Sequence, residues 1–455
     1  MNRLYYGDNL DVLRRHLDDQ SVDLVYLDPP FNSNASYSVL FAERNGSQAA
    51  SQIKAFEDTW RWDETAARAC AETIEAGGKV SEAMQAFRTF LGDSDMMAYL
   101  AMMAPRLIEL RRVLKPTGSL YLHCDPTASH YLKMLLDAVF GAQQFRNEVI
   151  WKRTTAHSSA NRFAPVHDVV FFYARGKAPT WNAPREDYEE EYLNRYYKYD
   201  GGMPQEKRYR EDLRGRAASD LWTDVNRINP VGNERLGYPT QKPEALLERM
   251  IDASSNEGDV VLDPFCGCGT TIAAALRLKR RWIGIDITSL AITLIRHRLA
   301  NAFGGRAKYE VIGEPVSLPD AAKLAHDDPY QFQWWALGLV GARPVEQKKG
   351  ADRGIDGRIY FHEGTAEKTK QIILSVKAGH VTVAHLRDLR GVLDREKAEM
   401  GVLLCMEEPT APMRKEAANA GFYISPWGKH PRLQILAVED LHYPGLRPRT
   451  AGGLE

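Results

Sequence analysis

The chain has 455 residues, of which 44% are hydrophobic and 26% charged, as in soluble globular proteins with room for two or three domains. Its 59 basic and 60 acidic residues leave a formal net charge of −1, which does not exclude nucleic acid because local basic stripes decide such binding. Five unevenly spaced cysteines argue against a disulfide framework and fit a reducing cytosol, so we expect a cytoplasmic protein. We find no signal-like region at the start and no apolar run of transmembrane length, so we expect no membrane partner.

Strand and helix patterns alternate from the start of the chain. Residues 4–8 are typical of a short strand that ends in a turn, and the apolar stripe within residues 10–17 predicts an amphipathic helix. Residues 21–27 predict a short buried strand. A strand, a helix and a strand in this order indicate an α/β sheet.

A long polar segment follows before the regular pattern resumes. Residues 44–93 are polar and irregular, and a connection of that length is typical of a functional or mobile loop. Beyond it we predict helices at 95–114 and 128–139 and strands at 119–123, 147–152 and 166–173.

The tetrapeptide Asp28-Pro29-Pro30-Phe31 stands at the end of the second predicted strand. Prolines fix φ and lack an N–H group, so they stiffen the backbone and let the carbonyls of Asp28 and Pro29 point outward as acceptors. Two acceptors beside an aromatic ring suit a flat substrate with an exocyclic amine, because the ring can stack on it. The alternative is a Pro-Pro turn after a strand, with Asp28 as the turn former.

Residues 153–237 differ in character, because Arg, Lys, Tyr and Asn are frequent there, as in Tyr196-Tyr197-Lys198-Tyr199 and Lys207-Arg208-Tyr209-Arg210. Basic side chains between aromatic ones suit phosphates together with stacked or edge-read bases. The alternative is a solvated helix face with i,i+4 charge pairs, since Glu189, Glu190 and Glu191 lie nearby.

Residues 240–312 return to alternating helices and strands around a glycine loop. Thr240-Gln241-Lys242-Pro243 opens a predicted helix that ends near residue 253, and the loop 264–269 follows an apolar strand at 260–263. The remaining elements are predicted as helices at 271–278 and 291–300 and strands at 282–286 and 308–312.

The glycine loop is typical of a nucleotide-binding turn, because Gly267 and Gly269 follow a strand and open a helix, and Asp286 lies about 20 positions beyond Gly267. NAD is disfavoured because Ile272 replaces the third fingerprint glycine and Asp263 would repel a pyrophosphate, and ATP because no P-loop lysine follows. S-adenosylmethionine (AdoMet) has no phosphate and carries an ammonium and a sulfonium, so a carboxylate at Asp263 favours it. An ordinary glycine turn is the alternative.

These motifs together resemble the β class of amino-group DNA methyltransferases, in which the catalytic motif precedes the AdoMet motif. The matching segments, in the family's order, are Leu4–Asp8, Asp28–Phe31, Arg111–Asp125, Tyr238–Leu247, Asp263–Thr271 and Gly284–Asp286. The resemblance implies an α/β, Rossmann-like methyltransferase sheet over residues 1–315, with 153–237 as an inserted target-recognition region. It implies catalytic roles for Asp28, Pro29, Pro30 and Phe31, and AdoMet contacts from Asp8, Thr240, Gln241, Lys242, Asp263, Pro264, Phe265, Gly267, Gly269, Thr270 and Asp286.

The implied reaction moves a methyl group from AdoMet to the N6 of an adenine flipped out of double-stranded DNA, in restriction-modification or phage defence. Adenine is favoured over cytosine N4 because Asp28 rather than Ser heads the tetrapeptide. A homodimer is compatible with this interpretation. The other candidates are a methyltransferase acting on RNA or protein amides, and a DNA-binding protein without activity.

A second, smaller α/β unit is predicted at residues 326–445 and resembles an Mrr-type restriction-endonuclease domain of the PD-(D/E)xK superfamily. Asp356 and Lys377 match the family's metal-binding acid and its lysine, so the resemblance implies a Mg²⁺ site. Ser375 stands where the family has an acid or Gln, and Gln333 stands where the opening helix often carries Glu. An active nuclease, an inactive DNA-binding domain and a plain accessory domain therefore remain alternatives.

Overall fold

The computed structural model spans residues 1–455, and the described residues are 1–30, 35–42, 48–58, 62–155, 161, 163–186, 199–200, 203–204, 216–228, 234, 236, 238, 240–315, 317–344, 354–361, 370–426 and 428–441. Phe31 lies outside them, as does much of the predicted target-recognition region. In the described part of that region, β8 (Arg185–Glu186) pairs with β11 (Arg216–Ala217), and β9 (Tyr199–Asp200) with β10 (Met203–Pro204).

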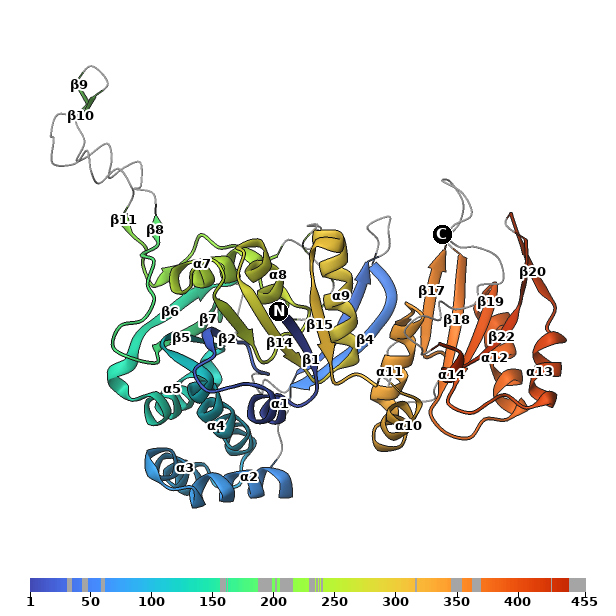
Figure 1. Cartoon of the computed structure of the whole chain (residues 1–455), viewed down its shortest axis with the longest axis horizontal. Helices are drawn as coiled ribbons and strands as arrows, with labels where there is room; N and C mark the ends of the chain where they lie inside the picture. Colours follow the sequence, from blue (N-terminus) through green and yellow to red (C-terminus); the bar gives the residue numbers. More distant parts are fainter. Residues whose placement is uncertain are drawn as a thin grey trace.

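The larger unit is built on one nine-stranded sheet (Figure 1). In sheet order the strands are β12 (Leu221–Trp222), β6 (Phe145–Lys152), β7 (His167–Ala174), β5 (Leu114–Cys124), β2 (Val22–Leu27), β13 (Val260–Asp263), β14 (Arg281–Asp286), β1 (Asn2–Tyr6) and β15 (Tyr309–Ile312). The strands from β5 to β15 run parallel, whereas β7 runs antiparallel to both of its neighbours. The predicted α/β fold is therefore confirmed, with a mixed sheet.

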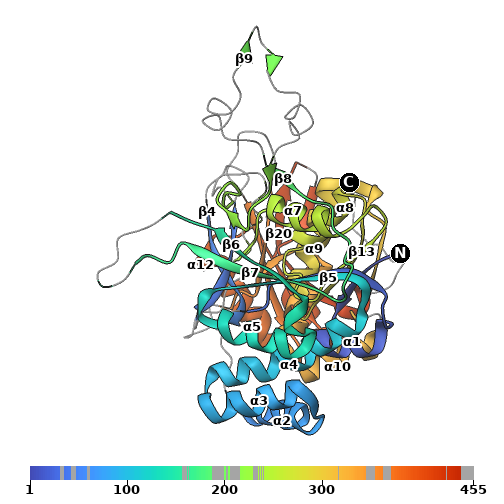
Figure 2. The ribbon, with the colours of Figure 1, turned by 90° about the vertical axis from the view of Figure 1, so that its left-hand side faces the viewer.

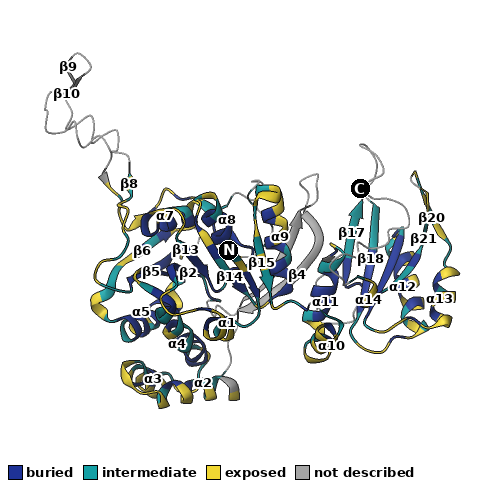
Figure 3. Cartoon of the chain, in the orientation of Figure 1, coloured by how far each residue is buried: buried dark blue, intermediate teal, exposed yellow. Residues whose placement is uncertain are grey.

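Helices cover both faces of this sheet, so its central strands are buried on both sides (Figures 1 and 3). One face carries α1 (Asn9–His16), α4 (Asp95–Val113) and α5 (Pro126–Phe140), and the other carries α7 (Glu244–Ser254), α8 (Thr270–Arg277) and α9 (Ser289–Phe303). Every residue of β2 and β13 is buried. This burial explains their nearly continuous apolar sequences, which are typical of parallel strands covered on both faces.

The expectation of an irregular loop over residues 44–93 is wrong. That stretch contains β4 (Gln48–Asp58), which pairs with β3 (Ala35–Ala42), and the helices α2 (Glu64–Glu75) and α3 (Gly78–Leu91). The two helices lie against α4 and α5 (Figure 2). In α3, apolar residues recur at Val80, Met84, Phe87 and Leu91, with Met84 and Phe87 buried. This helical spacing marks one apolar stripe, which the surrounding polar residues obscured in the sequence.

The second unit has a five-stranded sheet with helices on both faces. In sheet order its strands are β16 (Arg343–Pro344), β17 (Gly357–Phe361), β18 (Lys370–Lys377), β19 (Met400–Cys405) and β22 (Leu433–Ala437), and β20 (Phe422–Ser425) pairs separately with β21 (Gly428–Pro431). The helices are α10 (Leu318–Asp327), α11 (Pro329–Leu339), α12 (Val383–Glu396), α13 (Ala411–Ala418) and α14 (Val438–Leu441). Ala321 and Ala325 of α10 belong to this unit's core. In the described residues, no helix combines the length and apolarity needed to cross a bilayer.

A buried carboxylate ties three central strands of the large sheet together. Asp23 of β2 accepts hydrogen bonds from Lys115 Nζ of β5 at 2.8 Å and from the backbone N–H of Val260 in β13 at 2.9 Å. These contacts join strands that are distant in sequence, since β13 begins more than two hundred residues after the end of β2.

We expect Asp23→Ala to lower the free energy of unfolding of the large unit by about 1–3 kcal/mol, because the Val260 N–H loses its partner inside the protein. Asp23→Asn keeps an acceptor and should cost less. Asp19→Ala is the matched control, since Asp19 pairs with Arg112 but is 71% exposed, and should cost less than about 1 kcal/mol. Urea unfolding followed by tryptophan fluorescence measures the three values, and equal losses for Asp23→Ala and Asp19→Ala would contradict this account.

Candidate active site

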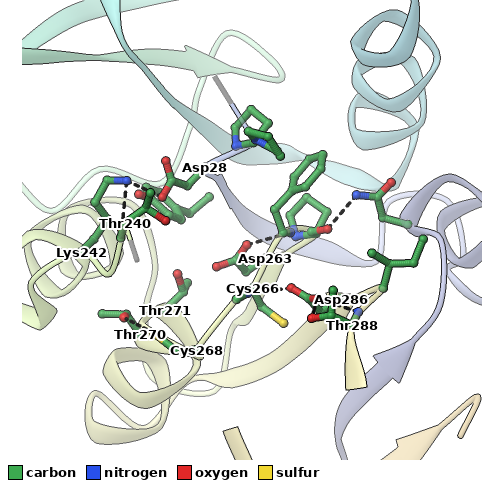
Figure 4. A pocket seen from close by; sticks show the side chains of 18 of the residues that line it. Asp28, Thr240, Lys242, Asp263, Cys266, Cys268, Thr270, Thr271, Asp286 and Thr288 are labelled. Carbon is green, nitrogen blue, oxygen red and sulfur yellow. Dashed lines mark hydrogen bonds and ion pairs between the residues drawn. The ribbon is translucent and has the colours of Figure 1, made fainter. Parts of the chain in front are cut away.

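The carboxyl ends of β1, β2, β13 and β14 meet at one edge of the sheet and surround a cavity of about 210 Å³ (Figure 4). Such an edge is where open parallel sheets bind ligands. The cavity is lined by most of the residues singled out in the sequence, namely Asp8, Asp28, Pro29, Pro30, Thr240, Gln241, Lys242, Asp263, Pro264, Phe265, Gly267, Thr270 and Asp286. Gly269 does not line it, and Phe31 lies outside the described residues.

The glycine loop connects β13 to α8 through two residues in the left-handed region. Gly267 has φ 48° and Gly269 has φ 75°. A Cβ at Gly269 would lie 2.8 Å from the Ile295 side chain of α9, and one at Gly267 would lie 3.1 Å from the ring of Tyr238. Glycine is therefore needed at Gly269 for close packing on α9 and at Gly267 for the approach of Tyr238.

Asp263 is buried at the end of β13 and faces the cavity. Its carboxylate accepts a hydrogen bond from the Phe265 backbone N–H at 3.0 Å and another from the Thr271 hydroxyl. Burial nevertheless raises the pKa of Asp263 to about 7. Among the described residues no lysine or arginine forms an ion pair with it, so a cation entering the cavity would stabilise its charged form.

Asp286 at the end of β14 links the glycine loop to α9. It accepts hydrogen bonds from the Gly267 N–H at 2.9 Å, the Thr288 N–H at 2.9 Å and the Thr288 hydroxyl at 2.8 Å. Burial raises the pKa of this carboxyl as well. Thr288 in turn caps the first turn of α9. Asp286 thus holds the turn that the cavity is built around.

Two arginines that the sequence analysis missed brace the cavity. From α4, Arg106 donates to Asp8 Oδ2 at 2.7 Å and to Asn9 Oδ1 at 2.5 Å, and Asn9 Nδ2 donates to the Pro264 carbonyl at 2.8 Å. These bonds join the first strand–helix turn to the glycine loop. Nothing local in α4 marks Arg106, since its role depends on how that helix packs.

The second missed residue is Arg298 of α9, a buried guanidinium behind the glycine loop. It donates to the Cys268 carbonyl at 3.1 Å, the Thr270 hydroxyl at 3.0 Å and Glu244 Oε1 at 3.0 Å. It therefore connects the glycine loop to the start of α7. A signal was present in the sequence, because a charged residue beside the apolar residues of α9 is unusual unless it is paired.

On the other side of the cavity, Asp28 directly follows β2 and forms an ion pair with Lys242 (Figure 4). Lys242 Nζ lies 2.5 Å from Asp28 Oδ2 and also donates to the Thr240 carbonyl at 3.3 Å. Pro29 and Pro30 line the cavity beside this pair. A carboxylate held at the mouth of an apolar strand can accept hydrogen bonds from a polar group placed in the cavity.

The predicted metal site of the second unit has a different arrangement. Asp356 is buried, and its Oδ2 accepts hydrogen bonds from the Ser375 hydroxyl at 3.1 Å and the Val376 backbone N–H at 2.6 Å. Asp356 therefore fastens the start of β17 to β18. Lys377 lies at the end of β18, and Gln333 is buried in α11. Within the described ranges no three His, Cys, Asp or Glu residues gather closely enough to hold a metal ion.

Two protein families match separate parts of the chain. Residues 22–296 match the N6/N4 methyltransferase family, described as DNA methylase. Residues 331–439 match a family described as NACHT-associated inactive Restriction Endonuclease 1. The first match covers most of the cavity lining and most of the large sheet, and the second covers strands and helices around Asp356.

Curated relatives and solved structures resemble the same region. The chain is 34% identical over 208 residues to the Type II methyltransferase M.HpaI of Haemophilus parainfluenzae (46% of this chain, 61% of the relative). It is 29% identical over 260 residues to M.EcaI of Enterobacter cloacae (45% and 58%), so it spans about three fifths of these relatives' length. The PvuII cytosine-N4-specific DNA methyltransferase shares 16% identity, with 66% of this chain and 86% of that chain covered and a TM-score of 0.40. The M1.HpyAVI–SAM complex shares 18% identity, with 66% of this chain and 99% of that chain covered and a TM-score of 0.37.

We expect the second unit not to cleave DNA in Mg²⁺ or Mn²⁺, because Asp356 accepts hydrogen bonds from Ser375 and Val376 and the described residues place no cluster of three metal-binding side chains around it. Plasmid nicking by the full chain and by Lys377→Ala should be equally absent. Asp356→Ala should lower the thermal midpoint of this unit, since the Val376 N–H loses its partner. Nicking by the full chain that Lys377→Ala abolishes would show an active nuclease.

Proposed function

Because the chain belongs to the N6/N4 DNA methylase family, we propose that it transfers a methyl group from AdoMet to an exocyclic amino group of a base in duplex DNA. The observation that carries this proposal is the shared cavity of Asp28 and Asp263. Asp28 is placed to accept a hydrogen bond from an amine, and the carboxylate of Asp263 favours a cation. A methyl transfer from a sulfonium to an amine needs both in one place.

The residues around Asp263 fit AdoMet on chemical grounds. A buried carboxylate with a raised pKa and no cationic partner among the described residues suits a ligand that carries an ammonium and a sulfonium. Asp286 offers a second carboxylate at the position where an acid meets ribose hydroxyls, and Gly267 keeps the loop close. Asp8, braced by Arg106, lines the same cavity from the N-cap position of α1. We assign these four residues to the cofactor.

The catalytic contribution of the protein lies in the arrangement around Asp28. When bound, AdoMet supplies an electrophilic methyl group, which the amine nitrogen takes up while the carbon–sulfur bond breaks and its electron pair returns to sulfur. Asp28 Oδ1 and the Pro29 carbonyl accept hydrogen bonds from the amine, which turns the nitrogen lone pair away from the ring. The departing amine proton leaves along the bond to Asp28. Fixed acceptors raise the rate by alignment rather than by strong basicity.

Adenine N6 is the amine that we assign to this cavity, and cytosine N4 is the second candidate. Asp28 heads the tetrapeptide and supplies two acceptor oxygens, one of which stays available when Lys242 holds the other. Phe31 completes the pocket in this proposal by stacking on the base. Stacking of a base on an aromatic ring is worth about 1–3 kcal/mol, which offsets part of the cost of flipping the base out of the duplex.

The second unit fits a role that does not require cleavage. Its matched family is described as inactive, and its Asp356 is engaged in its own sheet. We propose that it acts as a non-cutting, DNA-holding module appended to the methylase in a restriction-modification or defence system.

The reaction is tested by incubating the protein with duplex DNA and isotope-labelled AdoMet and hydrolysing the DNA to nucleosides for mass spectrometry. We expect the label in N6-methyl-2′-deoxyadenosine. Label in N4-methylcytosine would select the second candidate, and label confined to RNA or protein substrates offered in parallel would overturn the DNA assignment.

Asp28→Ala should abolish methyl transfer while the affinity for AdoMet stays within about threefold of the native value, because the residues assigned to the cofactor lie at the start of α1, at the ends of β13 and β14 and in the glycine loop. Asp28→Asn keeps the shape but donates a hydrogen bond where an acceptor is needed, so it should also be inactive. Isothermal titration calorimetry and a methyl-transfer assay measure the two quantities. Near-native transfer by Asp28→Ala would remove Asp28 from the mechanism.

The affinity for AdoMet should depend on pH through Asp263. The pKa of this carboxyl is about 7 in the folded protein, so below pH 7 the neutral form prevails and affinity should fall about tenfold per pH unit. Above pH 7 it should level off. The same raised pKa means that the stabilising contribution of neutral Asp263 is full below about pH 4 and is lost as the pH rises through 7.

Titrations between pH 5.5 and 7.5 test this dependence, with Asp263→Asn as the control that cannot ionise. Its affinity should be weak and nearly independent of pH. A native affinity that stays constant over the same range would rule out a titrating Asp263 as the partner of the cation.

A further inference from the structure

Lys242 is a buried ammonium inside the cavity, only 8% exposed. Its Nζ lies 2.5 Å from Asp28 Oδ2 and 3.3 Å from the Thr240 carbonyl. A charged side chain this deeply buried is stable only when it is paired. Two residues of the protein, Asp28 and Thr240, are partners of this ammonium. They belong to segments more than two hundred residues apart in the chain.

The segment that carries Lys242 is held in an unusual conformation. Thr240 has φ 61°, in the left-handed region that β-branched residues rarely adopt. Gln241 fastens the segment on the other side, because its Nε2 donates to the Glu234 carbonyl at 2.7 Å and its Oε1 accepts from the Leu236 N–H at 2.9 Å. The strained backbone turns the Thr240 carbonyl toward the ammonium. A strained backbone conformation persists only where the surrounding contacts hold it, and such residues are frequent at functional sites.

A second buried carboxylate, Asp168, is close enough for the charge of Lys242 to act on it. Asp168 of β7 is buried and is bonded by Arg153 Nε at 2.7 Å and His123 Nε2 at 3.3 Å. Burial opposes its ionisation, but the hydrogen bond with His123 and the charges nearby, that of Lys242 among them, lower the pKa of Asp168. Lys242 therefore lies among charges of the protein and does not need a carboxylate from the cofactor.

We propose that Lys242 is a positioning residue for Asp28, and not a contact to the cofactor as the family resemblance suggests; this inference rests on the proposed methyl transfer. Lys242 pins Asp28 Oδ2, so the carboxylate cannot rotate and Oδ1 points in one direction as the acceptor for the amine. The Thr240 carbonyl accepts a hydrogen bond from the ammonium, and Gln241 fastens the segment that carries both residues. The substrate thus meets an acceptor that is already oriented, which is the arrangement that lowers a barrier without tightening binding.

The first test separates turnover from binding. Lys242→Met should lower kcat about 100-fold, the loss typical of a reacting group misplaced by about 1 Å, while the dissociation constant for AdoMet changes less than about threefold. Lys242→Arg, which can still reach a carboxylate, should recover part of kcat. Lys279→Met is the matched control, because Lys279 pairs with Glu257 on the surface, and should behave like the native protein. Unchanged kcat in Lys242→Met would overturn the proposal.

The second test uses binding alone and so does not depend on the methyl-transfer reaction. The affinities of AdoMet and of decarboxylated S-adenosylmethionine are measured by calorimetry for the native protein and for Lys242→Met, and a normal thermal unfolding curve shows that the variant is folded. If Lys242 serves Asp28, loss of the ligand carboxylate weakens binding by the same factor in both proteins. If removal of the ligand carboxylate weakens binding at least tenfold more in the native protein than in Lys242→Met, Lys242 contacts the cofactor carboxylate and the proposal is wrong.

The two tests also distinguish this inference from the proposed function. If the native protein methylates no DNA, the proposed function is wrong, whatever affinities the binding test gives for the two ligands. A native protein that methylates DNA, with Lys242→Met equally active, contradicts only the role of Lys242.

Discussion

The parallel pairing of β2 with β13 is the constraint on which the rest of the molecule depends. Val25 pairs with Leu262, so the ends of the two strands lie within one residue of each other. Asp28 and Asp263 therefore reach the same cavity from segments more than two hundred residues apart. Asp23 secures the other end of this pair through Lys115 and the Val260 N–H. The spacing of side chains at the carboxyl edge follows from the strand register, so this register decides whether Asp28 and Asp263 line one cavity.

The cavity gathers four carboxylates, and the protein treats each one differently. Arg106 neutralises Asp8 and Lys242 neutralises Asp28, while Asp286 is held by N–H and hydroxyl groups of the glycine loop and α9. Asp263 has only hydrogen bonds among the described residues, and burial raises its pKa. Two of the four carboxylates are therefore paired with cations of the protein, whereas Asp263 and Asp286 are held by hydrogen bonds alone among the described residues, and burial raises the pKa of both.

In the second unit, the aspartate at the predicted metal position is bonded within its own sheet. The strand pair β17 and β18 retains the Asp and Lys of a nuclease, but the position of the middle acid is Ser375, whose hydroxyl donates to Asp356. A carboxylate that ties two strands together contributes to stability, because it satisfies a buried N–H group of the neighbouring strand. The appended unit meets the methylase through α11, where Gln331 accepts hydrogen bonds from the Tyr6 hydroxyl and the Ser289 N–H at 3.3 Å.

The sequence by itself determined the order of strands and helices around the site, the glycine loop and the tetrapeptide, because apolar runs, prolines and glycines act on their own neighbourhood. It did not reveal α2 and α3, whose short apolar stripe is hidden among polar residues. Only the tertiary structure decided that Arg106 braces Asp8, that Arg298 joins the loop to α7, and that Lys242 turns to Asp28. Those partners lie 54 to 214 positions apart, and no local pattern encodes a contact that exists only once the strands have paired.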